Sequence, residues 1–290
     1  MALHVYSLTN LPKLKQPIFM IGSFESFHIG HNMLFEKAKQ LQAASEYERD
    51  IVIVYFADVE NMPKNNGVFL TDEMFRLQAY AGIGIEHALR LKYLAIRHIW
   101  PLDFLTQLTK NQEDFDIITG TDFKFGVNAS GNSALLAQQY GQNYHAVDVM
   151  KLNNDQKVST SFIKELVGAG DFDLVNLLSL FKYGFNCSIT KISNFLELHV
   201  PEKLMPMRPG VYCANIEINE MYYYCLLLVK TDGTRNIEMI DFNWTSLDTH
   251  QCKVTVNMLL RPFYENSNQE SNDDDLTRSK EYFAFLSKCQ

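Results

Sequence analysis

The sequence lacks the features that mark nucleic-acid-binding, membrane-spanning or secreted proteins. Lys and Arg total 26 against 34 Asp and Glu, a net charge of −8, so the basic excess of a nucleic-acid-binding protein is absent. The longest apolar runs are far too short to span a bilayer, and the start, MALHVYSLTNLPKLK, does not resemble a secretory leader. We therefore expect a cytoplasmic protein that acts on small molecules and has no nucleic-acid or membrane partner. Its oligomeric state is left open.

The cysteines form no recognisable framework. They are five in number, have no CxxC spacing and all lie in the last part of the chain: Cys187, Cys213, Cys225, Cys252 and Cys289. An odd, unpatterned set predicts free thiols in a reducing compartment, not a disulfide scaffold or a zinc site. No protein-held metal site is predicted.

The stretch Pro17–Ala38, PIFMIGSFESFHIGHNMLFEKA, has the order strand, glycine-containing turn, helix. Its apolar run 18–21 predicts a strand buried on both faces, which ends at Gly22. The helix begins near His28–His31, so its unpaired N–H groups and positive dipole end lie where the strand ends, an arrangement that binds phosphate. The two histidines are one turn apart and would both face such an anion. Taken alone, such a pair is in most proteins a surface or satisfied pair of histidines, or half of a metal site.

A second candidate anion site is the segment 158–164, VSTSFIK, in which three hydroxyls and Lys164 open a predicted helix. Taken alone, Ser159, Thr160 and Ser161 form no more than a helix cap. Combined with a histidine pair at another strand end, they predict a clamp for a triphosphate.

The first part of the chain alternates strands with helices. Strands are predicted at 18–21, 51–56, 97–100, 115–119 and 144–149. One helix is predicted to begin at Thr71, and three more at 85–94, 101–109 and 133–140. Such alternation predicts a parallel sheet, with the ligand crevice at the carboxyl ends of its strands.

The pattern changes near Tyr183. Strand-like segments 211–218, 221–230, 237–242 and 253–259 follow, with turns at Asn219-Glu220 and Asp232-Gly233 and a last amphipathic helix over 276–288. We predict an α/β, Rossmann-like domain over 1–182, followed over 183–290 by a small antiparallel β-barrel domain with a C-terminal helix.

Four motifs occur in an informative order. They are H-x-G-H at 28–31, T-G-T-D-F-K-F-G at 119–126, V-S-T-S-F-I-K at 158–164 and P-G-V-Y at 209–212. The first is the signature of the "HIGH" superfamily of nucleotidyltransferases, and the full set resembles the bacterial bifunctional FAD synthetase family over nearly the whole chain. That family joins an FMN adenylyltransferase domain to a riboflavin kinase barrel. The resemblance implies Mg²⁺-dependent transfer of the adenylyl group of ATP to FMN, giving FAD and pyrophosphate.

The resemblance also implies roles for individual residues. His28, His31 and Lys164 take catalytic positions; Gly22, Ser23, Phe24, Gly30, Ser159, Thr160 and Ser161 bind ATP; and Asp122, Phe123 and Phe125 lie on the FMN side. Several positions depart from the family pattern. Ser23, Glu25 and Ser26 replace the usual Asn/Thr, Asp and Gly, Lys164 replaces Arg, and Phe56-Ala57-Asp58 stands where the family has Pro-His-Pro. Lysine keeps the charge of arginine but loses its bidentate fork, which predicts weaker nucleotide binding.

The kinase half departs further. The family's Pro-Thr-Ala-Asn aligns with Lys191-Ile192-Ser193-Asn194, where only the asparagine is retained. Asn236 falls at the position of the catalytic glutamate, and an amide cannot accept a proton as a carboxylate can. Glu238 is the nearest substitute on the same strand face. These departures predict a degenerate kinase domain with weak or lost activity.

Three alternatives remain open from the sequence. The enzyme could be fully bifunctional, or it could use another acceptor such as nicotinate mononucleotide or phosphopantetheine. The chain could also be a flavin-binding relic that lost both activities. The intact histidine pair opposes the relic hypothesis, and the T-G-T-D-F-K-F-G segment opposes the other acceptors.

Overall fold

The computed structural model describes residues 2–153, 155–192 and 195–289. The chain divides into two compact units, one formed by Met1–Phe69 with Arg76–Thr160 and the other by Leu70–Phe75 with Ser161–Gln290. Each unit is described by itself below. The functional division predicted at 182/183 stays a prediction.

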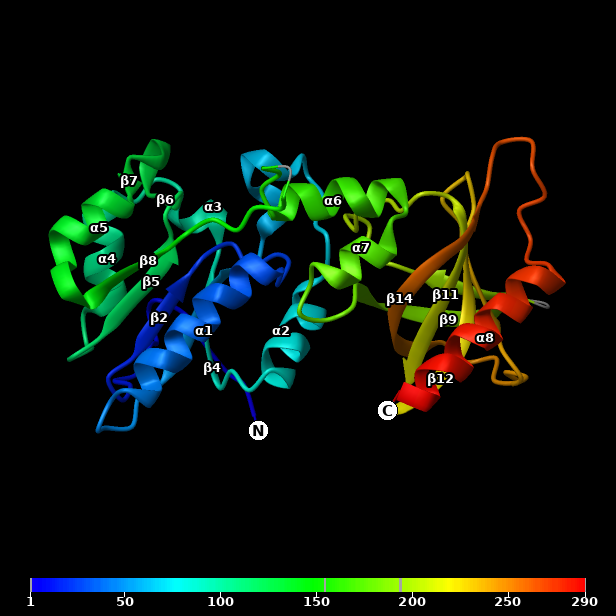
Figure 1. Ribbon diagram of the computed structural model, residues 1–290, viewed down its shortest axis with the longest axis horizontal. Coiled ribbons are helices and arrows are strands. Elements are labelled where there is room, and N and C mark those ends of the chain that lie inside the picture. The colour runs from blue at the N-terminus through cyan, green and yellow to red at the C-terminus, as the bar shows by residue number, and fades with distance from the viewer. Residues whose placement is uncertain (1, 154, 193–194, 290) are drawn as a thin grey trace. The chain divides into compact units, whose positions relative to one another are not determined.

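The first unit contains a six-stranded sheet in the order β1-β4-β3-β2-β5-β8, and all of its neighbouring strands are parallel (Figure 1). The strands are β1 His4–Tyr6, β2 Ile18–Ile21, β3 Ile51–Phe56, β4 His87–Leu91, β5 Asp116–Gly120 and β8 Tyr144–Val147. The chain builds outward from β2 to β3 and β4, then returns to add β5 and β8 on the other side. Ligands of such sheets bind at this reversal point, beside the carboxyl ends of the central strands.

The helices of this unit connect the strands as the predicted alternation requires. They are α1 Ile29–Ala43, α2 Glu73–Gly82 (which begins in the second unit's segment), α3 Tyr93–Ile96, α4 Pro101–Thr109 and α5 Ser133–Tyr140. Short 3-10 turns lie at Val59–Asn61, Pro63–Asn65, Val127–Ala129 and Gly141–Asn143, and β6 Lys124–Phe125 pairs with β7 Gly131–Asn132. Pro101 opens α4 at its first position, where a missing N–H costs nothing.

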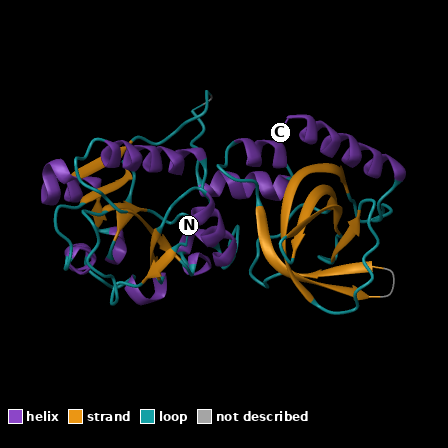
Figure 2. Ribbon diagram, turned by 90° about the horizontal axis from the view of Figure 1, so that it is seen from below, coloured by secondary structure: helices purple, strands orange, loops and turns teal. Residues whose placement is uncertain are grey.

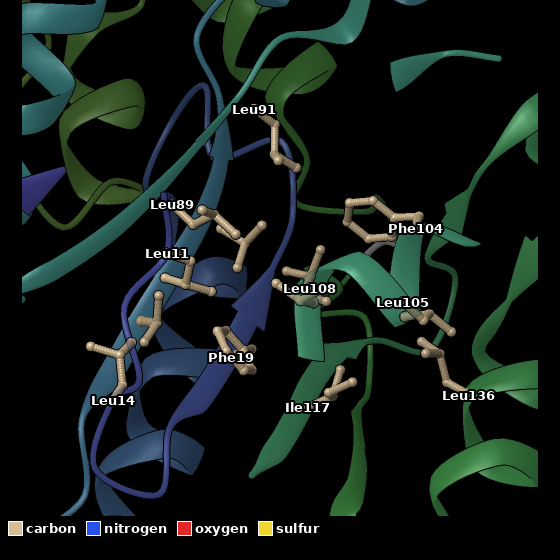
Figure 3. Close-up of a cluster of buried hydrophobic side chains, with 13 residues drawn as sticks. Leu11, Leu14, Phe19, Leu89, Leu91, Phe104, Leu105, Leu108, Ile117 and Leu136 are labelled. Atoms are coloured by element: carbon tan, nitrogen blue, oxygen red, sulfur yellow. The ribbon is translucent and has the colours of Figure 1, made fainter. Parts of the chain in front are cut away.

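Alternate residues of β2 face the two sides of the sheet. Phe19 and Ile21 belong to a buried cluster with Phe104 and Leu108 of α4 (Figure 3). Ile18 and Met20 point to the opposite side and are fully buried. Burying side chains of this size stabilises the fold by about 2 kcal/mol each. The unbroken apolar run predicted to be buried on both faces is confirmed.

Two predicted elements next to this sheet are wrong. The helix expected over 85–94 is largely strand β4, and no strand forms at 97–100, where α3 has just ended. The segment His87–Leu91 fits a helical as well as a strand period, and its place between β1 and β3 decides for strand. Asp58 accepts hydrogen bonds from the backbone N–H groups of Tyr93 and Leu94 at 2.5 and 3.2 Å, which favours a helical turn there.

The second unit contains helices α6 Thr160–Ala169 (whose first residue counts with the first unit), α7 Phe172–Leu177 and α8 Asp273–Cys289, and a closed barrel (Figure 2). Its strand order is β10-β13-β12-β11-β14-β9, and its strands are β9 Gly184–Ile192, β10 Phe195–His199, β11 Gly210–Ile218, β12 Met221–Val229, β13 Arg235–Met239 and β14 His250–Pro262. All of these pairings are antiparallel. The predicted barrel with a C-terminal helix is confirmed.

Helix α8 packs on the barrel through an apolar cluster. Phe283 of α8 is buried with Val211 and Leu226, and its ring stacks on that of Tyr224 at 4.0 Å. Among the described residues, no helix has both the length and the apolar character needed to cross a membrane.

Candidate active site

A pocket of about 760 Å³ opens at the carboxyl ends of the parallel strands. Five strands contribute their last residue to its lining: Ile21, Phe56, Leu91, Gly120 and Val147. This position is where open parallel sheets bind ligands. The predicted crevice therefore coincides with a cavity large enough for a nucleotide-sized molecule.

Buried residues fix the conformation of the turn between β2 and α1. Phe24 is fully buried with a φ of +44°, and its carbonyl oxygen accepts a hydrogen bond from the Tyr80 hydroxyl at 2.5 Å. Glu25 is also fully buried and accepts a hydrogen bond from Asn65 Nδ2 at 3.0 Å. A Cβ on Gly22 would lie 3.1 Å from the Phe24 ring, so a larger residue would displace that ring. Gly22 and Ser23 line the pocket. Phe24, which the resemblance also assigned to ATP binding, is fully buried and does not belong to the lining.

The two histidines lie face to face at the start of α1, and both line the pocket. Their ring centroids are 3.9 Å apart, with planes inclined by 17°. His28 is the N-cap residue, and its Nδ1 accepts a hydrogen bond from the His31 backbone N–H at 3.3 Å. His31 Nδ1 lies 2.5 Å from the carbonyl oxygen of Ser26.

These contacts fix the tautomers of the neutral rings. A backbone N–H can only donate, so His28 Nδ1 carries no proton and its Nε2 carries one. A carbonyl oxygen can only accept, so His31 Nδ1 carries the proton and Nε2 of its neutral ring is an acceptor. The two rings are therefore chemically distinct, although the motif makes them look equivalent.

Both rings are held in the neutral form. Burial, followed by the charges of Lys157 and Lys64, lowers the pKa of His28 to about 4. Burial and the neighbouring His28 lower the pKa of His31 well below its ordinary value, although its hydrogen bond to the Ser26 carbonyl opposes the shift. Near pH 7 the site therefore presents neutral imidazoles beside lysine charges.

The hydroxyl segment meets the histidine helix at Gly30. A Cβ on Gly30 would lie 3.0 Å from the His28 ring and 3.7 Å from the Val158 carbonyl oxygen. The Ser26 and Thr160 hydroxyls lie 3.0 Å apart. Ser159 and Thr160 line the pocket together with Gly30. Two segments more than a hundred residues apart in the sequence thus form one wall.

Ser161 and Lys164 lie on α6 and are counted with the second unit. They do not belong to the lining of the pocket in the first unit. Their predicted contact with ATP phosphates stays a prediction from the family resemblance.

The loop after β5 supplies an aromatic wall. The rings of Phe123 and Phe125 stack with centroids 5.4 Å apart and planes inclined by 13°, and both line the pocket with Asp122. Phe125 also packs on Phe104 at 6.0 Å. Gly126 has a φ of +74° and comes so close to Pro101 that a Cβ would clash. The predicted FMN-side residues therefore lie in the same cavity as the histidines.

Basic residues that no motif indicated also line the pocket. Lys157 lies two residues before the hydroxyl run and pairs with Asp122, and Lys64 lies in the second 3-10 turn after β3. Arg97 and His98 follow α3. A single lysine or arginine has no periodic or spacing signal, so only the fold reveals that these residues converge.

A second cavity, of about 430 Å³, lies in the barrel. Its lining includes Lys191, Asn236 and Glu238, three of the positions compared above with the kinase motifs. Asn236 is largely buried, and Glu238 accepts a hydrogen bond from the Ser271 hydroxyl. Ser193 and Asn194, which complete the compared motif, lie outside the described residues.

A parallel six-stranded sheet whose first long helix opens with a histidine pair makes the first unit an α/β, Rossmann-like domain. A family model described as FAD synthetase matches residues 11–162, just over half of the 290 residues, and the chain belongs to that family. The resemblance identified from the motifs is confirmed.

Individual relatives are distant. A protein of Buchnera aphidicola (subsp. Acyrthosiphon pisum, strain APS) named bifunctional riboflavin kinase/FMN adenylyltransferase is 25% identical over 168 residues, covering 56% of this chain and 53% of the relative. The protein of Arabidopsis thaliana named FAD synthetase 2, chloroplastic, is 23% identical over 125 residues, covering 42% of this chain and 33% of the relative. The matched part thus spans about half or less of the length of these relatives.

A solved structure from Streptococcus pneumoniae described as a macrolide-efflux protein resembles nearly the whole chain. Its TM-score is 0.80 at 16% identity, covering 97% of this chain and 98% of that one. Identity at this level shows a shared fold and does not assign an activity.

Proposed function

We propose that the chain is an FMN adenylyltransferase that converts FMN and ATP to FAD and pyrophosphate. The observation that carries the proposal is the stacked pair of histidines at the start of α1, in a pocket lined by the ends of five parallel strands. Membership of the FAD synthetase family supports FMN as the acceptor. The stacked Phe123 and Phe125 rings offer an apolar surface beside that pocket for a flavin ring.

In the proposed reaction an oxygen of the FMN phosphate forms a bond to the α-phosphorus of ATP. The bond from that phosphorus to the bridging oxygen of the β-phosphate breaks, and its electron pair leaves with pyrophosphate. The FMN phosphate is already anionic at neutral pH, so no side chain has to remove a proton. The work of the protein is then alignment and stabilisation of negative charge.

The tautomers divide this work between the histidines. His28 offers an Nε2–H donor while it is neutral, and the positive end of α1 favours a bound anion. His31 can donate from Nε2 only when its ring is protonated, a state that negative charge from a bound polyphosphate favours. Ser159 and Thr160 complete the phosphate side, and Ser161 and Lys164 are assigned to the outer phosphates on the family resemblance alone. Asp122 is assigned to the FMN side.

We propose that magnesium enters as part of the ATP substrate. In the described part of the chain, no group of three or more His, Cys, Asp or Glu side chains is suited to holding a metal ion. A nucleotide's own phosphates and water satisfy most of the coordination of Mg²⁺ in such sites, so a protein-built cage is not required.

The barrel unit is proposed to have weak or no riboflavin kinase activity. Asn236 lines the barrel cavity at the position compared with the catalytic glutamate, and its amide cannot take the proton of a riboflavin hydroxyl. Lys191 donates to the carbonyl oxygen of Trp244 at 2.7 Å, so its ammonium group is already engaged. The carboxylate of Glu238 is similarly engaged by Ser271.

The test is incubation of the purified protein with ATP and magnesium, once with FMN and once with riboflavin, followed by chromatography of the flavins. The proposal expects FAD from FMN and no product from riboflavin. FMN or FAD from riboflavin would show an active kinase and a bifunctional enzyme. Pyrophosphate release with nicotinate mononucleotide but not with FMN would indicate a different acceptor, and FMN binding without any product would indicate a relic.

A further inference from the structure

Lys157 and Asp122 form an ion pair in the lining of the candidate pocket. Asp122 follows β5 by two residues, on the side with the stacked phenylalanines. Lys157 immediately precedes the hydroxyl segment that meets the histidine helix at Gly30. The pair therefore connects the part of the lining that contains Phe123 and Phe125 with the part that contains Gly30 and Ser159.

The backbone of Lys157 is fixed more firmly than its side chain. Lys157 forms an antiparallel bridge with Lys151, and the next residue, Val158, donates its N–H to the Met150 carbonyl oxygen at 3.0 Å. On the other side, the Asp122 carboxylate folds back over Gly120, where a Cβ would lie 3.0 Å from Oδ1. The ammonium group is thus the part that can change partner by rotation of its side chain.

The ion pair itself is weak enough to exchange. The side chains of Lys157 and Asp122 are 47% and 52% exposed. Exposed ion pairs change an equilibrium by a factor of about five at most, because water and salt screen them. A phosphate group carries more charge than a carboxylate and forms stronger charge-assisted hydrogen bonds with an ammonium group.

The charge of Lys157 also reaches the histidine pair, since it contributes to the lowered pKa of both His28 and His31. An anion bound at these rings would therefore be attracted by the positive charge of Lys157. The charge of Lys64, in the 3-10 turn Pro63–Asn65, also lowers the pKa of both histidines.

We propose that Lys157 is a phosphate ligand that exchanges between Asp122 and the polyphosphate of the substrate, with Asp122 as a positioning residue that competes for it. This inference rests on the proposed function, because it concerns the same pocket. It assigns to Asp122 a role in setting the affinity for polyphosphate, in addition to its place beside the flavin.

The experiment is a double-mutant cycle read by calorimetric binding of inorganic pyrophosphate with magnesium, so no turnover is needed. Lys157→Met is expected to weaken binding about tenfold, the scale of one charged hydrogen bond. Asp122→Asn is expected to tighten binding about two- to fivefold by releasing the lysine. In the Lys157→Met background, Asp122→Asn is expected to give no gain, because no ammonium group remains to release.

A matched control is available on α1. Lys39 and Glu36 form an ion pair with side chains 46% and 50% exposed, and neither residue lines the pocket. Lys39→Met and Glu36→Gln change charge in the same way and are expected to leave pyrophosphate binding within about twofold, as for distant screened charges.

Two outcomes would overturn the inference. An equal gain from Asp122→Asn in both backgrounds would mean that the carboxylate only repels the anion and does not hold the lysine. Pyrophosphate affinity unchanged by Lys157→Met would mean that the lysine is no phosphate ligand. The cycle is independent of catalysis: if no FAD forms but the expected pattern holds, the proposed reaction fails while the exchange stands. If FAD forms and the pattern is absent, only the exchange fails.

Discussion

The tautomer assigned to His28 leads to a prediction that separates its structural role from its chemical role. Its Nδ1 caps α1 by accepting from the His31 N–H, and its Nε2–H is the group free to meet a phosphate. The Asn side-chain oxygen can replace Nδ1, whereas the longer Gln side chain can place an N–H near Nε2. His28→Asn therefore keeps the cap and loses the donor, and His28→Gln does the reverse.

The expected stability changes are small and ordered. The His31 N–H also donates to the His28 carbonyl oxygen at 2.8 Å, so loss of the 3.3 Å side-chain bond costs about 0.5 kcal/mol, the low end for an N-cap. All replacements lose the stacking of the two rings, which contributes about 1 kcal/mol. In urea unfolding, His28→Ala and His28→Gln should lose about 1.5 kcal/mol and His28→Asn about 1 kcal/mol.

The expected activities run in a different order. Removal of one preorganised donor to a transition-state oxyanion lowers turnover about 10²- to 10³-fold, so His28→Asn and His28→Ala should both fall by that factor. His28→Gln should retain about a tenth of the parent turnover, because it keeps a donor in a less rigid position. The assay is initial FAD formation from FMN at saturating MgATP. A His28→Asn enzyme more active than His28→Gln would refute the tautomer assignment.

Three further predictions follow. His31→Ala is expected to lower FAD turnover about 10²-fold, and a rate within a few-fold of the parent would exclude a catalytic role. Burial and nearby lysines lower the pKa of folded His28 to about 4, so the unfolded chain binds a proton below about pH 6.5 that the native chain does not. His28 alone should therefore lower the free energy of unfolding by about 2 kcal/mol from pH 7 to pH 5 in urea titrations, His31 should add to this fall, and His28→Asn should remove the His28 share. Burial raises the pKa of the Cys213 and Cys225 thiols, so both should react with a disulfide reagent at pH 8 at least about tenfold faster after unfolding than before, and equal rates would contradict their burial.

The parts of the fold that the sequence predicted well are those where burial alone decides. The run Ile18–Ile21 is apolar at every position and ends at Gly22, as is typical of a short strand covered on both faces. The apolar residues of His87–Leu91 fit a helical and a strand period, so the sequence pattern alone does not distinguish the two. The true state of this segment depends on hydrogen bonds to β1 and β3, which no local pattern contains. Strand β1 was missed for the same reason, as a three-residue edge strand.

For the candidate site, too, the sequence predicts what the sheet topology decides and does not predict what tertiary contacts decide. The motifs at 28–31 and 119–126 follow strands, and a parallel sheet places the carboxyl ends of its strands at one edge. Of the motif at 158–164, residues 158–160 line the same pocket, whereas Ser161 and Lys164 are counted with the second unit. The sequence could not show that Phe24 lies beneath the turn, because burial of an aromatic ring depends on partners such as Tyr80. Nor could it distinguish His28 from His31, since their tautomers are set by the Ser26 carbonyl and by the first N–H groups of α1.

The chain carries a net charge of −8, yet its proposed substrates are anions. The two facts are compatible because charges beyond about 8 Å are largely screened at physiological salt, so a phosphate responds to its immediate surroundings. Around the pocket these include Lys64, Lys157 and the positive end of the α1 dipole. The same lysines disfavour protonation of His28 and His31, and a bound polyphosphate would cancel that effect. In the proposed reaction, Nε2 of His31 would therefore donate a hydrogen bond only when a phosphate is bound to accept it, which would couple the protonation state of the site to its occupancy.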